Sequence, residues 1–276
     1  MSKLTPEDVV LRYSKRGMNI LKKYLKDGYC RTAAEKLLHA ERGTVLLTTG
    51  FYVAGYAETD GPLGTVAVAG ALNHLGFHSV VVTDKYCKGF FELKQLDVEY
   101  VDIAADEQVY EDILDKYNPV YMISIERCGE NAEHEYANMR GVSITSETAA
   151  IDHLFELAPE KHIPTIGVGD GGNEIGMGNV KDIISEKLEL NPCVVPVDDL
   201  IIATTSNWGA YALTAWLQKL SGEEVLFTFA EAEPYLAATL EIGSVDGVLK
   251  EKKMGVDGFD MTVEKEILDS LAEAIA

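Results

Sequence analysis

Short apolar runs rich in β-branched residues recur along this chain and alternate with stretches of helical periodicity. The runs are apolar on both faces, which is typical of strands buried in a parallel sheet with helices on either side. We therefore predict an α/β fold, layered, with a mostly parallel sheet flanked by helices. The expected strands are residues 44–49, 78–84, 98–103, 120–126, 163–170, 192–197 and 200–206.

Helical patterns occupy most of the segments between these strands and both ends of the chain. Thr5 is a natural N-cap followed by Pro6, and it predicts a first helix that runs to about Lys26. The tail contains two identical Val-Asp-Gly tripeptides, at 245–247 and 256–258, which we interpret as surface turns. The other expected helices are residues 31–39, 62–76, 85–96, 106–117, 146–160, 174–190, 207–221, 231–241 and 263–276.

The 276 residues are expected to form a single α/β domain, because no low-complexity linker interrupts them. Within it we distinguish N-terminal helices (1–42), a core that carries the motifs (43–221) and a helical C-terminal appendage (222–276). Large α/β proteins are often symmetric assemblies, so a homo-oligomer is the expectation.

The formal net charge of −21 at pH 7 repels nucleic acid and anionic membranes, so neither is an expected partner. Apolar runs stay shorter than the roughly 18 residues of a membrane span. The first residues are charged and lack the apolar centre of a signal peptide, which favours a cytoplasmic location. The 4 cysteines are far apart, so we expect reduced structural thiols rather than disulfides or a metal cluster.

The segment TIGVGDGGNEIGMG, residues 165–178, passes from an expected strand into a loop with six glycines. Glycine leaves the backbone uncovered, so a ligand or ion can approach the main chain closely. The strong polar side chains in the loop are Asp170, Asn173 and Glu174. Loops that bind phosphates usually place Lys, Ser or Thr beside their N–H groups, whereas this one carries carboxylates. It therefore favours a cation, an ammonium group or proton transfer.

Gly167, Gly169 and Gly172 also match the G-x-G-x-x-G pattern of dinucleotide-binding loops. Asp170 would face the pyrophosphate there, and no acid ends a second strand about 20 residues further on, where ribose recognition needs one. We therefore expect no nucleotide cofactor. The chain has no G-x-S-x-G motif, and Ser206 lacks an obvious histidine partner, which argues against acyl-serine chemistry.

Polar side chains follow several of the expected strands directly. Because the carboxyl ends of parallel strands meet at one edge, and ligands bind beyond that edge, we expect these side chains to converge. Helix capping would by itself explain Asp60 and Asp84, each of which stands where a helix begins. The converging residues are Glu58, Asp60, Asp84, Glu126, Arg127, Asp170, Asn173, Glu174, Ser206 and Asn207.

Carboxylates brought close together repel, so they must bind a cation, accept ammonium donors or share protons. Oxygen-rich sites without His or Cys suit Mg²⁺, Mn²⁺ or Ca²⁺. The 6 histidines form no H-x-x-H or H-E-x-x-H pattern, which disfavours a zinc hydrolase. The sequence therefore predicts a divalent cation (Mn, Mg or Ca), with Glu126, Asp170 and Glu174 as its ligands.

Five motifs, in this order, resemble those of the D-glutamate cyclase family, and they span roughly residues 45–220. They are ETDGPLG (58–64), SIERCG (124–129), YANMRG (136–141), GVGDGGNEIGMG (167–178) and SNWGAYAL (206–213). The resemblance implies an α/β fold and a lyase that forms 5-oxo-D-proline and water from D-glutamate. The chain departs from the family at residues 130–134, where it reads ENAEH in place of Arg-Ala-x-Asp-Gly.

Formation of such a lactam requires a base for the ammonium proton and neutralisation of the carboxylate that loses oxygen. We expect Glu58, Asp60 and Asp84 to serve as base and ammonium-binding residues. Arg127 and Arg140 could clamp substrate carboxylates, although Arg127 could instead pair with neighbouring acids. The expected substrate-binding residues are Thr49, Gly50, Arg127, Asn138, Arg140, Asn173, Ser206 and Asn207.

Two other functions stay open at this point. A Mg- or Mn-dependent hydrolase of a small phosphorylated metabolite would use the same carboxylates, and release of phosphate would identify it. A non-catalytic small-molecule or ion-binding protein would bind tightly without turnover. In all three cases the expected partner is a small molecule.

Overall fold

The computed structural model describes residues 4–276 and has a six-stranded parallel sheet at its centre. The strands are β1 (Thr44–Thr49), β4 (His78–Thr83), β5 (Asp97–Tyr100), β6 (Tyr121–Ile125), β7 (Thr165–Gly169) and β8 (Asp199–Ile202). They lie in the order β5-β4-β1-β6-β7-β8, so the direction of winding reverses between β1 and β6. In open sheets of this kind, ligands bind beyond the carboxyl ends of the strands at the point of reversal.

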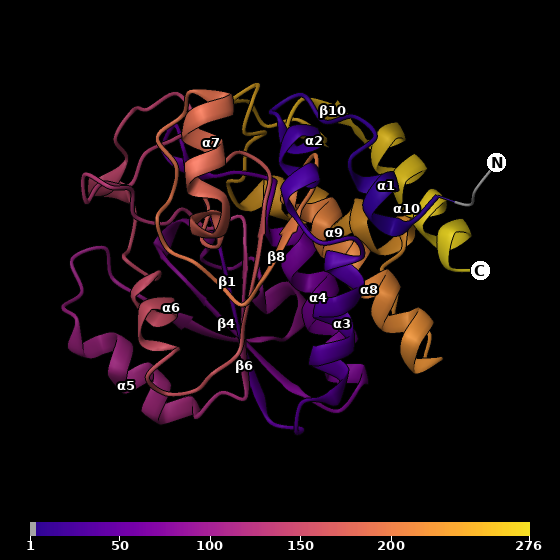
Figure 1. Ribbon diagram of the computed structural model, residues 1–276, viewed down its shortest axis with the longest axis horizontal. Coiled ribbons are helices and arrows are strands. Elements are labelled where there is room, and N and C mark those ends of the chain that lie inside the picture. The colour runs from indigo at the N-terminus through magenta and orange to yellow at the C-terminus, as the bar shows by residue number, and fades with distance from the viewer. Residues whose placement is uncertain (1–3) are drawn as a thin grey trace.

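Helices cover both faces of the sheet, which confirms the predicted α/β layering. One side carries α3 (Tyr29–His39), α4 (Pro62–His74) and α8 (Ser206–Ser221), and the other carries α5 (Gln108–Tyr117) and α6 (His153–Leu157) (Figure 1). Helix α4 begins with Pro62, whose missing N–H would have no helical partner at that position. Helix α8 begins at the N-cap Thr205, whose side chain accepts the Trp208 N–H.

The N-terminal and C-terminal helices of the chain pack against each other and against α8. Helix α1 (Pro6–Val10) opens with a capping box between Thr5 and Asp8, and it packs against α8 and α10 (Met261–Ile275). Helix α9 (Phe229–Ile242) packs against α4 and α10. Glu264 of α10 accepts hydrogen bonds from Trp208 at 2.6 Å and Tyr211 at 2.8 Å, both on α8. Buried hydrogen bonds therefore fasten the C-terminal segment to the core.

The first predicted helix is wrong in its length. The segment forms α1, then α2 (Met18–Leu21) and the 3-10 turn η1 (Lys22–Tyr24). Gly17, with φ of 87°, precedes α2 in a conformation that favours glycine. The loop between α1 and α2 carries Arg16 to the carboxyl edge of the sheet.

Three other predicted helices are interrupted. Segment 85–96 forms only η2 (Lys85–Cys87) and η3 (Glu92–Lys94), and Gly89 between them has φ of 90°. The C-terminal part of 146–160 forms α6, preceded by η4 (Thr145–Glu147). The segment 174–190 begins as a loop and continues as η5 (Met177–Val180) and α7 (Lys181–Leu188).

Residues 192–197 do not form the predicted strand. Pro192 and Pro196 lack the N–H groups that a sheet ladder needs. The Cys193 N–H instead donates to the Gly172 carbonyl, so the segment braces the glycine-rich loop. The two Val-Asp-Gly tripeptides lie at turns, as expected, but the side chains of Asp246 and Asp257 are buried instead of standing at the surface.

Two small hairpins complete the fold, β2 (Tyr52–Val53) with β3 (Tyr56–Ala57) and β9 (Gly255–Val256) with β10 (Phe259–Asp260). Among residues 4–276, no helix combines the length and the apolar character needed to cross a bilayer.

Candidate active site

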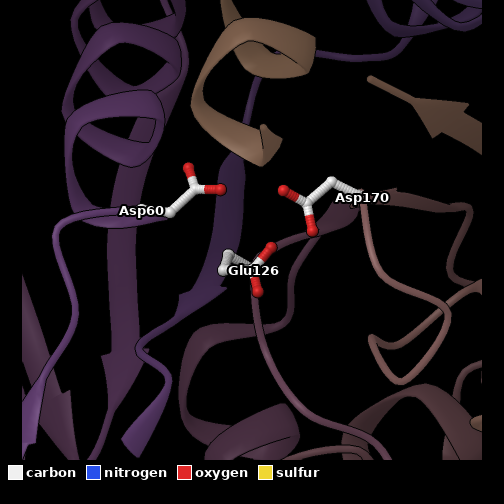
Figure 2. Close-up of side chains that lie close together, drawn as sticks. All are labelled: Asp60, Glu126 and Asp170. Carbon is white, nitrogen blue, oxygen red and sulfur yellow. The ribbon is translucent and has the colours of Figure 1, made fainter. Parts of the chain in front are cut away.

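Three carboxylates that follow three different strands meet at the carboxyl edge of the sheet. Asp60 ends the loop after β1, Glu126 follows β6, and Asp170 follows β7. One oxygen of each lies within 4.8 Å of the other two, and Figure 2 shows the side chains pointing toward one another from three separate segments. All three are buried. Because β1 and β6 flank the reversal in winding, the cluster lies where such sheets bind ligands.

Asp60 joins the starts of two helices. Its carboxylate accepts the backbone N–H of Ser206 at 2.8 Å and of Asn207 at 2.7 Å, at the first turn of α8. The Asn207 side-chain oxygen in turn accepts the N–H of Gly61 at 2.9 Å and of Gly64 at 2.7 Å, at the start of α4. Asp60 is therefore a cap, but of α8 rather than of the helix that follows it in sequence. The positive ends of both helices lie beside the acidic cluster and reduce its repulsion.

Glu126 has a backbone conformation that is uncommon for a residue with a side chain. Its φ is 48°, in the left-handed region, and such conformations are concentrated at functional sites. The backbone N–H donates to the Val168 carbonyl at 3.2 Å, which fixes the turn at the end of β6. The Ser206 hydroxyl donates to the Glu126 carboxylate at 2.5 Å. This backbone conformation and this hydrogen bond together hold the Glu126 carboxylate in the cluster.

Glu174 organises the glycine-rich loop. Its two oxygens accept the backbone N–H groups of Asp170, Gly171 and Gly172 at 3.2, 2.7 and 2.7 Å. These are the N–H groups that a pyrophosphate would need, so an internal carboxylate occupies the anion-binding face of the loop. Asn173 donates to the Ala137 carbonyl at 2.8 Å and anchors the loop from its other side.

Glu58 lies beside the cluster in the same pocket and is buried. Its carboxylate makes no hydrogen bond with any residue of the described chain, so it is free to exchange protons or to bind a ligand. Gly247 makes room for it, because a Cβ at that position would stand 1.8 Å from the Glu58 Oε2 atom. The C-terminal segment thus shapes the pocket around Glu58.

Two residues of the site were not predicted from the sequence, Arg16 and Asp257. The Arg16 Nη1 atom lies 2.7 Å from Asp170 Oδ1 and 2.8 Å from Asp257 Oδ2. Neither residue follows a strand of the parallel sheet, whereas a position after an expected strand is what indicated the other site residues. The repeated Val-Asp-Gly tripeptide was visible in the sequence, but nothing in it indicated that its second aspartate turns inward.

Burial raises the pKa values of the cluster carboxylates and of Glu58. Burial raises the pKa of Glu58 and Glu126 well above the ordinary range, and neighbouring carboxylates add to the effect. Burial likewise raises the pKa of Asp170, although the charge of Arg16 opposes the shift. For Asp60, burial and the charge of Asp257 raise the pKa to about 8. These groups therefore keep their protons to higher pH than free carboxyl groups do, and a bound cation would oppose this shift.

The pocket above the cluster encloses about 270 Å³, just under the roughly 300–1,000 Å³ typical of sites for drug-sized ligands. A small metabolite would therefore fill it. Its floor is acidic, whereas Arg140 and Lys250 stand exposed among the residues that line it. Apolar walls come from Phe51, from the β2–β3 hairpin that follows it, and from residues 138–144, including Met139 and Ile144. Asn138 and Asn173 also line this pocket.

Seven of the predicted site residues lie outside the pocket lining, namely Thr49, Gly50, Asp60, Asp84, Arg127, Ser206 and Asn207. Arg127 is buried and forms an ion pair with Asp84 at 2.6 Å. The same guanidinium donates to the carbonyls of Gly50 at 2.9 Å and Ala149 at 2.6 Å. Thr49 is buried at the end of β1. The structure thus places Arg127, Asp84 and Gly50 in one buried network that supports the loop after β1. Of the two roles expected for Arg127, the structure therefore shows the ion pair with a neighbouring acid.

The cluster has the properties of a site for a hard divalent cation. Asp60, Glu126 and Asp170 offer only oxygen atoms, which Mg²⁺, Mn²⁺ and Ca²⁺ prefer. The Oδ2 atom of Asp170 is buried without a hydrogen-bond partner in the described chain, so it retains its full capacity to bind a ligand. Glu174 and Asp60 both use their two oxygens on backbone N–H groups. Asp60 is the one with an oxygen within 4.8 Å of both Glu126 and Asp170, whereas Glu174 supports the loop beneath the cluster. The residues present fit such a cation, with Asp60 beside Glu126 and Asp170.

The fold and the site define a layered α/β protein with a buried acidic pocket at the point where its parallel sheet reverses. The chain belongs to the family described as D-glutamate cyclase-like, C-terminal, whose model matches residues 7–272. The resemblance inferred from the five motifs is thus confirmed. A human relative, named D-glutamate cyclase, mitochondrial, is 32% identical over 259 residues, which is 80% of this chain. The chain spans 40% of that relative's length.

Solved structures add little to this assignment. A UDP-glucose 4-epimerase from Brucella ovis in complex with NAD matches 54% of this chain and 49% of its own, at 14% identity and a TM-score of 0.33. The Bordetella bronchiseptica enzyme WbmG, also in complex with NAD, matches 75% of this chain and 62% of its own, at 12% identity and a TM-score of 0.32. Similarity this low carries no argument about fold or ligand.

Proposed function

We propose that this chain is a D-glutamate cyclase-like lyase, which forms 5-oxo-D-proline and water from D-glutamate. The observation that carries the proposal is the distribution of charge in the pocket. The carboxylates are buried at its floor, whereas one guanidinium reaches them and two further cations, Arg140 and Lys250, lie exposed. An amino acid with one ammonium and two carboxylate groups complements this arrangement. Membership of the D-glutamate cyclase-like family supports the same substrate.

The reaction forms one C–N bond and breaks one C–O bond. The α-nitrogen attacks the carboxyl carbon of the γ-carboxylate group and loses two protons, and both leave with an oxygen of that carboxylate as water. The net charge of the substrate is unchanged. The site must therefore take protons from nitrogen and deliver them to oxygen, which a carboxylate of raised pKa can do in both directions.

Glu58 is our candidate for this proton carrier. It lines the pocket, its carboxylate has no hydrogen-bond partner in the described chain, and burial raises its pKa. It would accept a proton from the α-ammonium and return it to the departing oxygen. Asp60, which we expected in a catalytic role, instead stands with the candidate cation ligands.

We propose that Asp60, Glu126 and Asp170 hold a divalent cation, which when bound neutralises the γ-carboxylate and assists the departure of its oxygen. Glu174 and Ser206 hold two of these ligands in place. The pocket would also position the α-nitrogen against the carbon of the γ-carboxylate group, and ideal orientation can contribute up to roughly 7–11 kcal/mol.

The remaining predicted site residues fall into those that would contact the substrate and those that support the site. Arg140 and Asn138 line the pocket and would contact the substrate near its mouth, while Asn173 and Asn207 orient the loop and the helices beneath it. Arg127 and Asp84 would act only as buried support. A homo-oligomer and a cytoplasmic location stay predictions.

The test is incubation of the protein with D-glutamate and Mn²⁺, followed by NMR. We expect the α-proton signal of glutamate to be replaced by that of the lactam, with loss of primary amine and slower or no conversion of L-glutamate. No conversion with Mn²⁺, Mg²⁺ or Ca²⁺ would contradict the proposed reaction. Release of phosphate from a panel of phosphorylated metabolites would favour the hydrolase instead, and binding without turnover would favour a non-catalytic protein.

A further inference from the structure

Arg16 lines the acidic pocket, although it comes from the loop between α1 and α2 rather than from the sheet edge. Its side chain is 21% exposed, so the guanidinium is largely withdrawn from water and still reachable from the pocket. Arg140 and Lys250 also line the pocket, but both are exposed. Arg127 is buried in the network behind it. Among the described residues, Arg16 is therefore the cation that can meet a ligand inside the pocket.

The contacts of Arg16 use one of its three nitrogen atoms. The ion pairs with Asp170 and Asp257, at 2.7 and 2.8 Å, both involve Nη1. No residue of the described chain accepts a hydrogen bond from its Nε or Nη2 atoms. A guanidinium carries five N–H donors, and Nε with Nη2 forms an edge that matches a carboxylate bidentately. Arg16 is thus fixed along one edge and free along the other.

Asp257 explains how the guanidinium keeps this position. Its carboxylate is 4% exposed and comes from the turn between β9 and β10, far from Arg16 in sequence. It holds Nη1 together with Asp170, so two carboxylates fix the group from two sides. A side chain as flexible as arginine would otherwise lose rotamer freedom when it binds a ligand, and a prior constraint lowers that cost.

The chemistry of lactam formation decides which substrate group would meet this edge. The γ-carboxylate loses an oxygen, so it belongs beside the cluster of Asp60, Glu126 and Asp170. The α-carboxylate persists in the product and requires only charge recognition. Asp170 contacts Arg16 through Oδ1 and takes part in the cluster, so the two binding positions adjoin each other.

On these grounds we propose that Arg16 binds the α-carboxylate of the substrate through its free Nε–Nη2 edge, and that Asp257 is the positioning residue that holds it there. This inference rests on the proposed function. It assigns the carboxylate-binding role to Arg16 instead of Arg127, and it gives the C-terminal segment a part in substrate recognition.

The experiment compares two ligands that differ by this one group. D-Glutamate carries the α-carboxylate, whereas 4-aminobutyrate is the same molecule with hydrogen in its place. The variants are R16Q, R16K and D257N, and the control is R12Q, whose arginine pairs with the exposed Glu266 and does not line the pocket. KM and kcat are measured for D-glutamate, and the inhibition constant is measured for 4-aminobutyrate. Thermal melts establish that each variant is folded.

We expect R16Q to raise KM for D-glutamate about 10- to 100-fold, the effect of losing hydrogen bonds between charged groups. The inhibition constant of 4-aminobutyrate should stay at the parental value. R16K keeps the charge but loses the fork, so its KM should lie between those of R16Q and the parent. D257N should raise KM for D-glutamate alone, because the aspartate acts through Arg16. R12Q should match the parent for both ligands.

Equal weakening of both ligands by R16Q would overturn the inference, since it would show general damage to the pocket. An unchanged KM in R16Q would overturn it as well. If the parental protein does not convert D-glutamate, the proposed function fails by itself. Calorimetric dissociation constants for the same two ligands then test Arg16 in the same way.

Discussion

Asp60, a member of the acidic cluster, and Asn207 beside it cap each other's helices. Asp60 accepts the Asn207 N–H at 2.7 Å, and the Asn207 side chain accepts the Gly61 and Gly64 N–H groups at 2.9 and 2.7 Å. The two loops that deliver Asp60 and Ser206 to the site are thereby locked to one another. These reciprocal hydrogen bonds between Asp60 and the Asn207 segment therefore hold the cluster rigid.

Asn207→Ala is expected to lower the free energy of unfolding by about 1–3 kcal/mol, because the buried Gly64 N–H loses its acceptor and the Gly61 N–H keeps only Asp60. Urea denaturation measures the change. Asn179→Ala is the matched control, since the Asn179 side chain also makes two backbone hydrogen bonds but is exposed. Equal losses of unfolding free energy in the two variants would show that the reciprocal cap stabilises the protein no more than an exposed pair of hydrogen bonds.

Asp170→Asn should reduce kcat/KM by about 10²-fold or more, since electrostatic groups in active sites commonly have effects of this size. Its neighbours are glycines, and its carboxylate contacts Arg16 instead of capping a helix, so the fold should persist. Activity assays and thermal melting are compared with those of Asp182→Asn, an exposed aspartate in the first turn of α7. Near-parental turnover in D170N would move the active site away from the glycine-rich loop.

Glu58→Gln and Glu264→Gln are expected to have opposite consequences, although burial raises the pKa of both glutamates. E58Q removes the proposed proton carrier and should lower kcat by about 10²–10⁴-fold. It also removes one of several repelling carboxylates, so the melting temperature should stay equal or rise. E264Q disturbs the hydrogen bonds to Trp208 and Tyr211, so it should lower the melting temperature and spare kcat. Loss of activity in E264Q alone would contradict the assignment.

Gly247→Ala tests whether the C-terminal segment shapes the pocket. The new Cβ would stand 1.8 Å from Glu58 Oε2, so the carboxylate must move. We expect a large loss of kcat with a small loss of stability. Gly70→Ala is the control, because a Cβ there meets nothing within 4 Å and the helix interior favours alanine by about 0.5–1 kcal/mol. Parental kcat in G247A would show that the position of Glu58 is not critical.

The stability of the metal-free protein should fall as pH rises through neutrality. The folded state raises the pKa of Glu58, Glu126 and Asp170, and that of Asp60 to about 8, so it binds protons more tightly than the unfolded chain. Their contribution is therefore complete below the ordinary carboxyl pKa of about 4 and is lost as pH rises through the folded values.

Melting in EDTA between acid and alkaline pH measures this loss. Mn²⁺ should flatten the profile, because a cation at the cluster replaces the protons, and it should add about 2.7 kcal/mol at a hundredfold excess over its Kd. A melting temperature that changes neither with pH nor on addition of Mn²⁺, Mg²⁺ or Ca²⁺ would contradict the cation site.

The sequence by itself determined the layered α/β fold, because strands buried on both faces read as continuous apolar runs. It also indicated that acids after different strands would converge, since a parallel sheet brings its carboxyl ends to one edge. Glu126 and Asp170 illustrate this rule, because each directly follows a strand, and Asp60 joins them from the end of the longer loop after β1. The five motifs were enough to identify the family.

Only the tertiary structure decided which acids face the pocket and which support it. Glu174 and Arg127 carry charges that suggested ligand binding, yet neighbouring backbone groups and Asp84 satisfy them. Arg16 and Asp257 come from the two ends of the chain, outside the sheet. Their approach to Asp170 depends on how α1 and α10 pack against α8, and local sequence carries no information about contacts over that separation.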